Sequence, residues 1–90
     1  MTFQLIVSGR VQGVGYRYYV QSLADKYKIK GTVRNQSNGN VMIIAQTDYE
    51  TLGQFISHLK IPQHRWMRID NVNIEEIKLD KNYSDFRTIY

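Results

Sequence analysis

Hydrophobic residues near the start of the chain change their spacing once, from strand-like to helix-like. Residues 3–7, FQLIV, have the apolar and β-branched density of a strand, and Ser8 and Gly9 end it. The next apolar residues fall on one helical face: Tyr16, Tyr19, Val20, Leu23, Ala24 and Tyr27. Because residues three and four positions apart share a face of a helix, this pattern predicts an amphipathic helix.

A strand, a tight turn and a return strand are predicted next. Val33 lies between polar neighbours after Gly31, which is the alternation expected of a strand. Asn38 and Gly39 favour a hairpin turn, because both residue types tolerate positive φ. Residues 41–46, VMIIAQ, supply the returning strand.

A second helix is predicted to begin near Thr47 and to end before Pro62. Thr47 followed three residues later by Glu50 matches a capping box, with Thr47 as the cap. Proline cannot continue a helix, so Pro62 ends it. The apolar face of this helix is expected to consist of Leu52, Phe55, Ile56 and Leu59.

The last part of the chain completes an α+β pattern. Residues 67–79 predict a strand, with a bulge or a change of face between Ile74 and Ile77, and residues 86–90 can add a short final strand. The order β-α-β-β-α-β predicts a ferredoxin-like two-layer sandwich. We expect its antiparallel sheet to have the order fourth, first, third, second strand, with the two helices on one face. Residues 1–90 are expected to form a single domain.

Composition narrows the possible classes of function. The chain has no cysteine, which excludes disulfides, thiolate metal sites and a cysteine nucleophile. It has neither a signal-peptide pattern nor an apolar run of the ~20 residues that cross a bilayer. We therefore expect a cytoplasmic monomer with no membrane partner. The net charge of +4 favours anionic ligands, although the one basic cluster, residues 64–68, is interpreted as solvated surface.

The segment GRVQGVGYR, residues 9–17, has the composition of an anion-binding loop. Its glycines permit positive φ and close approach of the backbone, so successive N–H groups can point at one anion. The loop leads into a helix N-terminus, which also favours negative charge. Arg17 lies in the first helical turn, and its planar guanidinium matches two phosphate oxygens. The segment is interpreted as a phosphate cradle, and the alternative is a strand-to-helix turn without a ligand.

The predicted topology brings this loop close to Asn35. The first and second strands both end at one edge of the sheet, two strand spacings or roughly 10 Å apart. No acidic residue lies within 9–17 or 31–40, and His58 and His64 are expected on the surface, away from the loop. Without a general base or carboxylates to hold a metal ion, an enzyme with its site at this edge would act by positioning its substrate and stabilising charge. Phosphoryl transfer from a substrate with a good leaving group tolerates such a site.

Two motifs resemble those of the acylphosphatase family. Residues 7–17 resemble the family signature almost throughout, and residues 31–35 with Gly39 and Val41 resemble its second motif. The ending NYSDFRTIY resembles the usual C-terminus of the family. The resemblance covers a complete domain. It implies hydrolysis of the carboxyl–phosphate bond of acyl phosphates, without a metal or another cofactor, and phosphate or other small anions as product or inhibitor.

The same resemblance implies roles for individual residues. Arg17 would clamp the phosphate oxygens, and Asn35 would orient the attacking water, a role that rests on the resemblance alone. The backbone of the loop would hold the phosphate through Gly9, Arg10, Val11, Gln12, Gly13, Val14, Gly15 and Tyr16.

Three residues depart from the family pattern. Thr32 replaces an aromatic residue. Because strand neighbours point to opposite faces, we expect Thr32 to lie apart from the immediate surroundings of Asn35 unless a bulge intervenes, and to affect packing more than chemistry. Tyr16 replaces phenylalanine, which adds a hydroxyl that needs a partner. Thr47 replaces glycine and can cap the second helix. None of these changes removes a proposed catalytic group.

Two non-catalytic functions are alternatives to hydrolysis. An RNA-recognition module shares the order of elements, but strand 41–46 has no aromatic residue for base stacking, and the usual signature is absent. We therefore expect no specific nucleic-acid partner. A regulatory domain that binds small anions is the second alternative, and the presence of both Arg17 and Asn35 argues against it.

Overall fold

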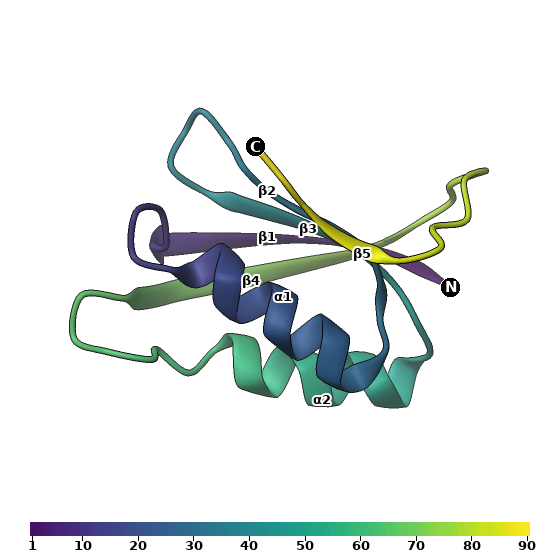
Figure 1. The fold of residues 1–90 in the computed structure, drawn as a ribbon, viewed down its shortest axis with the longest axis horizontal. Helices are drawn as coiled ribbons and strands as arrows, with labels where there is room; N and C mark the ends of the chain where they lie inside the picture. The colour runs from purple at the N-terminus through teal and green to yellow at the C-terminus, as the bar shows by residue number, and fades with distance from the viewer.

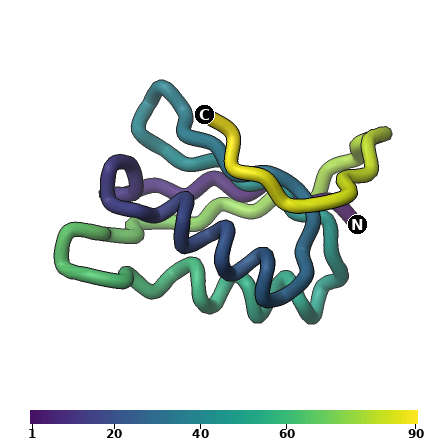
Figure 2. Tube along the Cα trace, viewed as in Figure 1, coloured from purple at the N-terminus to yellow at the C-terminus, as the bar shows by residue number.

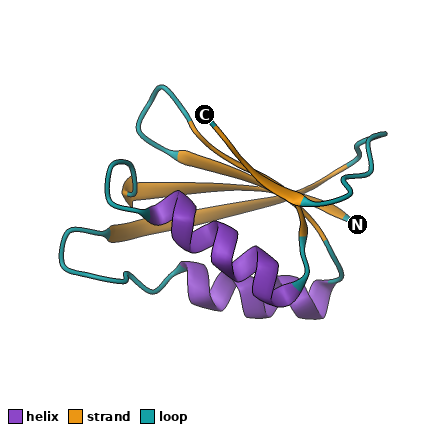
Figure 3. Cartoon of the chain, in the orientation of Figure 1, coloured by secondary structure: helices purple, strands orange, loops and turns teal.

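Two helices cover one face of a five-stranded sheet (Figures 1 and 3). The structure, a computed structural model, describes residues 1–90. Its elements are β1 (Thr2–Arg10), α1 (Tyr16–Tyr27), β2 (Lys30–Asn35), β3 (Val41–Gln46), α2 (Tyr49–Leu59), β4 (Arg68–Ile77) and β5 (Phe86–Ile89). The strand order is β4-β1-β3-β2-β5. This confirms the predicted α+β sandwich and the predicted order of its first four strands.

The fifth strand makes the sheet mixed. β1 to β4 pair antiparallel, as predicted, whereas β5 pairs parallel to β2 from Gly31–Phe86 to Arg34–Ile89. After β4, residues 78–85 carry the chain to the opposite edge of the sheet, where the yellow C-terminal segment returns along β2 (Figure 2). β5 therefore runs toward the end of the molecule that holds loops 11–15, 36–40 and 60–67 (Figure 2).

The hydrophobic core lies between the sheet and the helices. Alternate residues of β1 and β3 point into it, so these central strands are buried on that face. The helices contribute their predicted apolar faces, which are buried as expected. Fully buried members from the sheet and helices include Leu5, Val7, Val20, Ile43, Phe55 and Leu59. Neither α1 nor α2 combines the length and hydropathy that a membrane crossing requires.

The structure corrects the predicted cap of α2 and decides between the two alternatives predicted for β4. The N-cap of α2 is Asp48 and not Thr47, because the Asp48 carboxylate accepts a hydrogen bond of 2.7 Å from the Thr51 N–H. The bulge lies opposite Ser8 and Gly9, where the register of β4 shifts past Asp70. Ile74 and Ile77 pair regularly with β1 and lie on opposite faces, so the slip in apolar spacing is the predicted change of face.

Candidate active site

A cavity of about 370 Å³ opens beside the N-terminus of α1. It lies where the carboxyl ends of β1 and β2 meet at one edge of the sheet, with β3 between them. This is the edge that the sequence predicts. Arg17 and Asn35 both line this cavity. Its full lining is Val11, Gly13, Gly15, Tyr16, Arg17, Tyr18, Gln21, Asn35, Thr88 and Tyr90.

The loop from Val11 to Gly15 presents unpaired backbone donors. None of its N–H groups donates to another backbone group. Gly13 and Gly15 have φ values of 73° and 82°, in the left-handed region that glycine tolerates. Gly15 is the N-cap of α1, no side chain caps this helix, and its first turn holds no acidic residue. The free N–H groups of the loop and of the first helical turn therefore form a site suited to an anion.

Four of the predicted loop residues do not line the cavity. Gly9 and Arg10 belong to β1 and pair with β4. The Gln12 side chain donates hydrogen bonds to the carbonyls of Gln36 and Asn40, at 2.7 and 2.8 Å. Gln12 thus ties the loop to the β2–β3 hairpin, next to Asn35. The fourth residue is Val14, whose carbonyl oxygen contacts the side chain of His64.

Arg17 is held by the C-terminus of the chain. Its Nη1 donates a hydrogen bond of 3.0 Å to the Ile89 carbonyl, and its guanidinium lies 4.7 Å from the centre of the Tyr90 ring. These contacts occupy one N–H and one face of the guanidinium, so other N–H groups remain available for a ligand. Motif reasoning did not assign the last two residues to the site, because the parallel pairing of β5 is a long-range feature.

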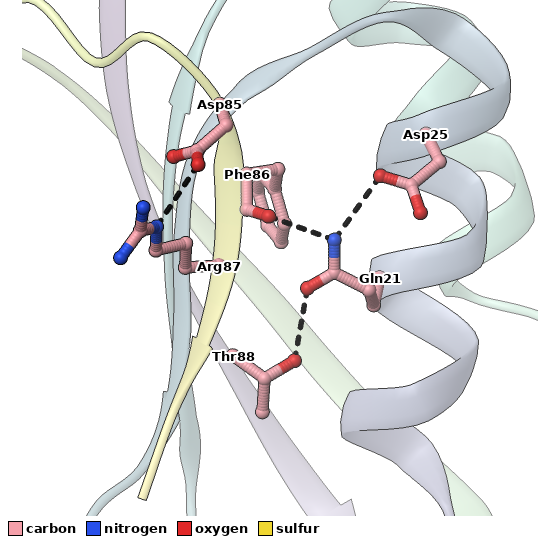
Figure 4. Close-up of polar contacts among 6 residues, drawn as sticks. All are labelled: Gln21, Asp25, Asp85, Phe86, Arg87 and Thr88. Carbon is pink, nitrogen blue, oxygen red and sulfur yellow. Dashed lines mark hydrogen bonds and ion pairs between the residues drawn. The ribbon is translucent and has the colours of Figure 1, made fainter.

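Gln21 fastens β5 to α1 (Figure 4). Its Nε2 donates to the Phe86 carbonyl at 2.8 Å and to Asp25 Oδ1 at 3.1 Å. Its Oε1 accepts a hydrogen bond of 2.9 Å from the Thr88 hydroxyl. The strand that carries the Arg17 acceptor is therefore fixed to the helix that carries Arg17.

Asn35 ends β2 on the face that points toward the helices. It alternates with buried Val33, whereas Thr32 points to the opposite face beside Ile44 and Arg87. The separation expected between Thr32 and Asn35 is thus confirmed. The Asn35 Oδ1 atom is buried and has no hydrogen-bond partner within the protein. Asn35 lines the cavity, and the acceptor capacity of its amide oxygen is not used by any group of the protein.

His64 contradicts the prediction that both histidines lie away from the loop. Its Nε2 is 2.8 Å from the Val14 carbonyl oxygen. The connection between α2 and β4 turns back beside the loop, and buried Met67 anchors its end. No local spacing signals this contact, because the two residues are 50 positions apart.

The Tyr16 hydroxyl has a hydrogen-bond partner in α2. It donates a hydrogen bond of 3.0 Å to the Leu59 carbonyl. Burial raises the pKa of the Tyr16 phenol well above its ordinary value, and the nearby Tyr19 raises it further. Tyr16 therefore remains a neutral donor that joins the first turn of α1 to the end of α2.

The lining of the cavity defines what chemistry it can perform. None of its residues is acidic or a histidine, so no side chain there is suited to act as a general base. No group of three or more histidine and carboxylate side chains is arranged to hold a metal ion. What the cavity offers is a guanidinium, free backbone N–H groups and an amide oxygen. Such a set can bind a phosphoryl group and align a water.

Comparison with known proteins identifies relatives over nearly the whole chain. A family model described as Acylphosphatase matches residues 3–88. The chain is 47% identical to an acylphosphatase of Treponema denticola, over 92% of this chain and 86% of that protein. It is 44% identical to an acylphosphatase of Ligilactobacillus salivarius, over 98% and 97%. The crystal structure of acylphosphatase from Bacillus subtilis superposes with a TM-score of 0.88 at 34% identity, covering 99% of this chain and 98% of that chain.

Proposed function

Because the chain belongs to the acylphosphatase family, we propose that its glycine loop and Arg17 hold the phosphoryl group of an acyl phosphate while Asn35 orients water. The enzyme hydrolyses the carboxyl–phosphate bond of acyl phosphates to a carboxylate and inorganic phosphate. The roles of its residues are the proposal. The observation that carries it is that Asn35, whose Oδ1 has no hydrogen-bond partner in the protein, lines the same cavity as Arg17.

The phosphoryl group is proposed to lie over the N-terminus of α1. The N–H groups of residues 11–15 have no backbone acceptor there, and Arg17 adds a full positive charge. These donors gain strength as negative charge builds on the phosphoryl oxygens during transfer. The Ile89 carbonyl accepts one N–H of the guanidinium, which leaves the other N–H groups for the phosphate.

Asn35 is proposed to align the nucleophile. Its amide oxygen accepts a hydrogen bond from a water molecule, which directs the oxygen of that water at phosphorus. The new phosphorus–oxygen bond forms as the bond to the acyl oxygen breaks, and the electron pair leaves with the carboxylate. The proton of the water passes to a phosphoryl oxygen of the substrate, since the cavity provides no side-chain base. A carboxylate is a good leaving group, so this path needs no general acid.

The same site is proposed to bind inorganic phosphate and related small anions, as product or inhibitor. The net charge of +4 supports such binding. We also propose that the reaction needs no metal ion and that the chain acts as a monomer. Release of phosphate from benzoyl phosphate should be equally fast with and without a chelator. Failure of the folded protein to release phosphate from any acyl phosphate would contradict the proposed function.

Substitution separates the two proposed roles. Arg17→Ala should lower kcat/KM by about a thousandfold and weaken inhibition by phosphate, because charge on the phosphoryl oxygens is no longer neutralised. Asn35→Ala should lower kcat by about a hundredfold with the inhibition constant for phosphate nearly unchanged, because water alignment matters only in the reaction.

Matched controls lie elsewhere on the chain. Lys26→Ala removes one positive charge at the far end of α1, and Asn73→Ala removes an exposed amide from β4. Both should retain the kinetics of the unmodified enzyme. If Asn35→Ala weakens phosphate inhibition as much as it lowers kcat, Asn35 binds phosphate and the water-aligning role is wrong.

A further inference from the structure

We propose that His64 is a positioning residue that turns the Val14–Gly15 peptide so that the Gly15 N–H faces the substrate phosphate. The proposal rests on the proposed phosphate-holding role of the loop. His64 belongs to the connection between α2 and β4, not to the cavity wall. It nevertheless contacts the loop directly, with its Nε2 2.8 Å from the Val14 carbonyl oxygen.

The second ring nitrogen fixes the tautomer of His64. Its Nδ1 lies 3.2 Å from the backbone nitrogen of Trp66, whose N–H donates to it. A nitrogen that accepts a hydrogen bond carries no proton, so the neutral ring carries its proton on Nε2. Nε2 is therefore the donor in the contact with Val14. The imidazole links one backbone donor and one backbone acceptor and is oriented by both.

The geometry of the peptide bond links the position of the Val14 carbonyl to the direction of the Gly15 N–H. The Val14 carbonyl and the Gly15 N–H belong to one peptide unit, and the chain contains no cis peptide. In a trans peptide the C=O and N–H bonds point in opposite directions. A carbonyl held toward His64 therefore directs the N–H of the next residue away from His64. Gly15 lines the cavity, so this donor is directed toward the proposed phosphate.

The loop needs such a restraint because it has few others. Gly13 and Gly15 both flank Val14, and a Cβ built on either glycine would meet no atom within 4 Å. Glycine occupies positive and negative φ about equally, so the peptide between Val14 and Gly15 can rotate at low energy. Gln12 restrains the loop from the hairpin side, and His64 restrains it from the α2 side.

The backbone around His64 is held by several contacts. The Met67 N–H donates to the His64 carbonyl at 3.1 Å, and the Met67 side chain is buried. The Gln63 N–H also contacts Met67 Sδ at 3.4 Å. Because Tyr16 joins α1 to Leu59, the start of this connection is fixed relative to the loop as well. His64 thus acts from a fixed support, which a positioning residue requires.

Kinetics of His64 variants test the proposal. His64→Ala should raise the inhibition constant for phosphate and lower kcat/KM, each by about fivefold, because one oriented hydrogen bond is lost. In His64→Gln the side-chain amide can still donate to the Val14 carbonyl, so kcat/KM should recover to within about twofold of the unmodified enzyme. His58→Ala is the matched control, since this imidazole packs on Tyr27 and makes no hydrogen bond. It should change neither constant.

Two outcomes of the kinetics would overturn the proposal. Unchanged constants in His64→Ala would show that the contact does not position the loop. Equal losses in the alanine and glutamine variants would show that hydrogen-bond donation is not what His64 provides. The thermal unfolding midpoint of each His64 variant should equal that of the unmodified protein, because His64 is exposed and contributes little packing.

NMR of the unmodified protein tests the geometry without substitution. The imidazole nitrogen shifts of His64 should report a proton on Nε2, and a proton on Nδ1 alone would overturn the proposal. The Gly15 amide should shift when inorganic phosphate is added, and this shift should be smaller in His64→Ala. If phosphate inhibits the enzyme but leaves the Gly15 amide unmoved, the loop-binding proposal itself fails. If that amide responds equally in both proteins, only the role of His64 fails.

Discussion

Glycine is required at Gly9 for a different reason than at Gly13 and Gly15. Gly9 has φ 128°, and a Cβ built there would lie 2.1 Å from the Arg68 carbonyl oxygen. It therefore allows β1 and β4 to approach at the bulge. Gly13 and Gly15 have open space around them and require only their positive φ. One motif thus combines a packing requirement of the sheet with a conformational requirement of the loop.

Alanine substitutions should separate these requirements. Gly9→Ala should lower the free energy of unfolding by at least about 2 kcal/mol, because the new methyl group collides with the backbone of β4. Gly53→Ala in α2 is the control, since its Cβ meets nothing within 4 Å. It should raise stability by about 0.5–1 kcal/mol, as expected for a helix interior. Urea unfolding measures both, and a neutral Gly9→Ala would contradict the close approach.

Residues of the site differ in how readily the sequence reveals them. Asn35 ends one predictable strand, and Arg17 follows another through the glycine loop, so their meeting at one edge could be predicted and is confirmed. His64 and Tyr90 could not be assigned in this way. Their contacts with the loop and with Arg17 depend on backbone positions that become neighbours only after folding. No periodicity encodes such contacts.

Among the elements, β5 is short and depends on its neighbours. It has four residues at the edge of the sheet, and its docking on α1 relies on the hydrogen bonds of Gln21. It also supplies the acceptor for Arg17. The position of the guanidinium is therefore linked to the stability of an edge strand.

Hydrogen exchange should reveal this dependence. In Gln21→Ala, amides of β5 should exchange about tenfold faster than in the unmodified protein, because two hydrogen bonds to the strand are lost. Amides of the central strands β1 and β3 should keep their rates. Gln54→Ala, an exposed position on α2, is the control and should leave β5 unchanged. Uniform acceleration of all strands would show that Gln21 stabilises the whole fold and not β5 in particular.

The elements were mostly predictable because their patterns are local. Both helices and the first four strands follow from apolar periodicity and turn residues, and the structure confirms their order. The predicted N-cap of α2 was wrong by one residue. Thr47 and Asp48 both belong to residue types that cap helices well, and only the geometry of the chain selects between them. The site of the bulge was also not predictable, because a bulge depends on the partner strand.

At the scale of the whole molecule, the cavity connects parts that are distant in the chain. The loop after β1, the end of β2 and the C-terminus all contribute to its wall. A bound anion would therefore contact several elements at once. Binding to the folded state alone stabilises that state by mass action.

Phosphate should accordingly stabilise the whole fold. At a concentration tenfold above its dissociation constant, it should add about 1.4 kcal/mol to the free energy of unfolding. For a domain of this size the unfolding midpoint should rise by roughly 5–10 °C. Chloride at equal ionic strength controls for the general effect of salt on a positively charged protein. Arg17→Ala should show little of this rise, and an equal rise in that variant would place the bound phosphate elsewhere.

The sequence by itself determined the α+β order of elements, the glycine loop, and the placement of Arg17 and Asn35 at one edge of the sheet. These features follow from local periodicity and from the direction of successive strands. Only the tertiary structure decided that the C-terminus holds Arg17, that His64 contacts the Val14 carbonyl, and that Asn35 Oδ1 is buried without a partner. Hydrogen bonds and burial depend on distances between residues far apart in the chain, and packing alone sets those distances.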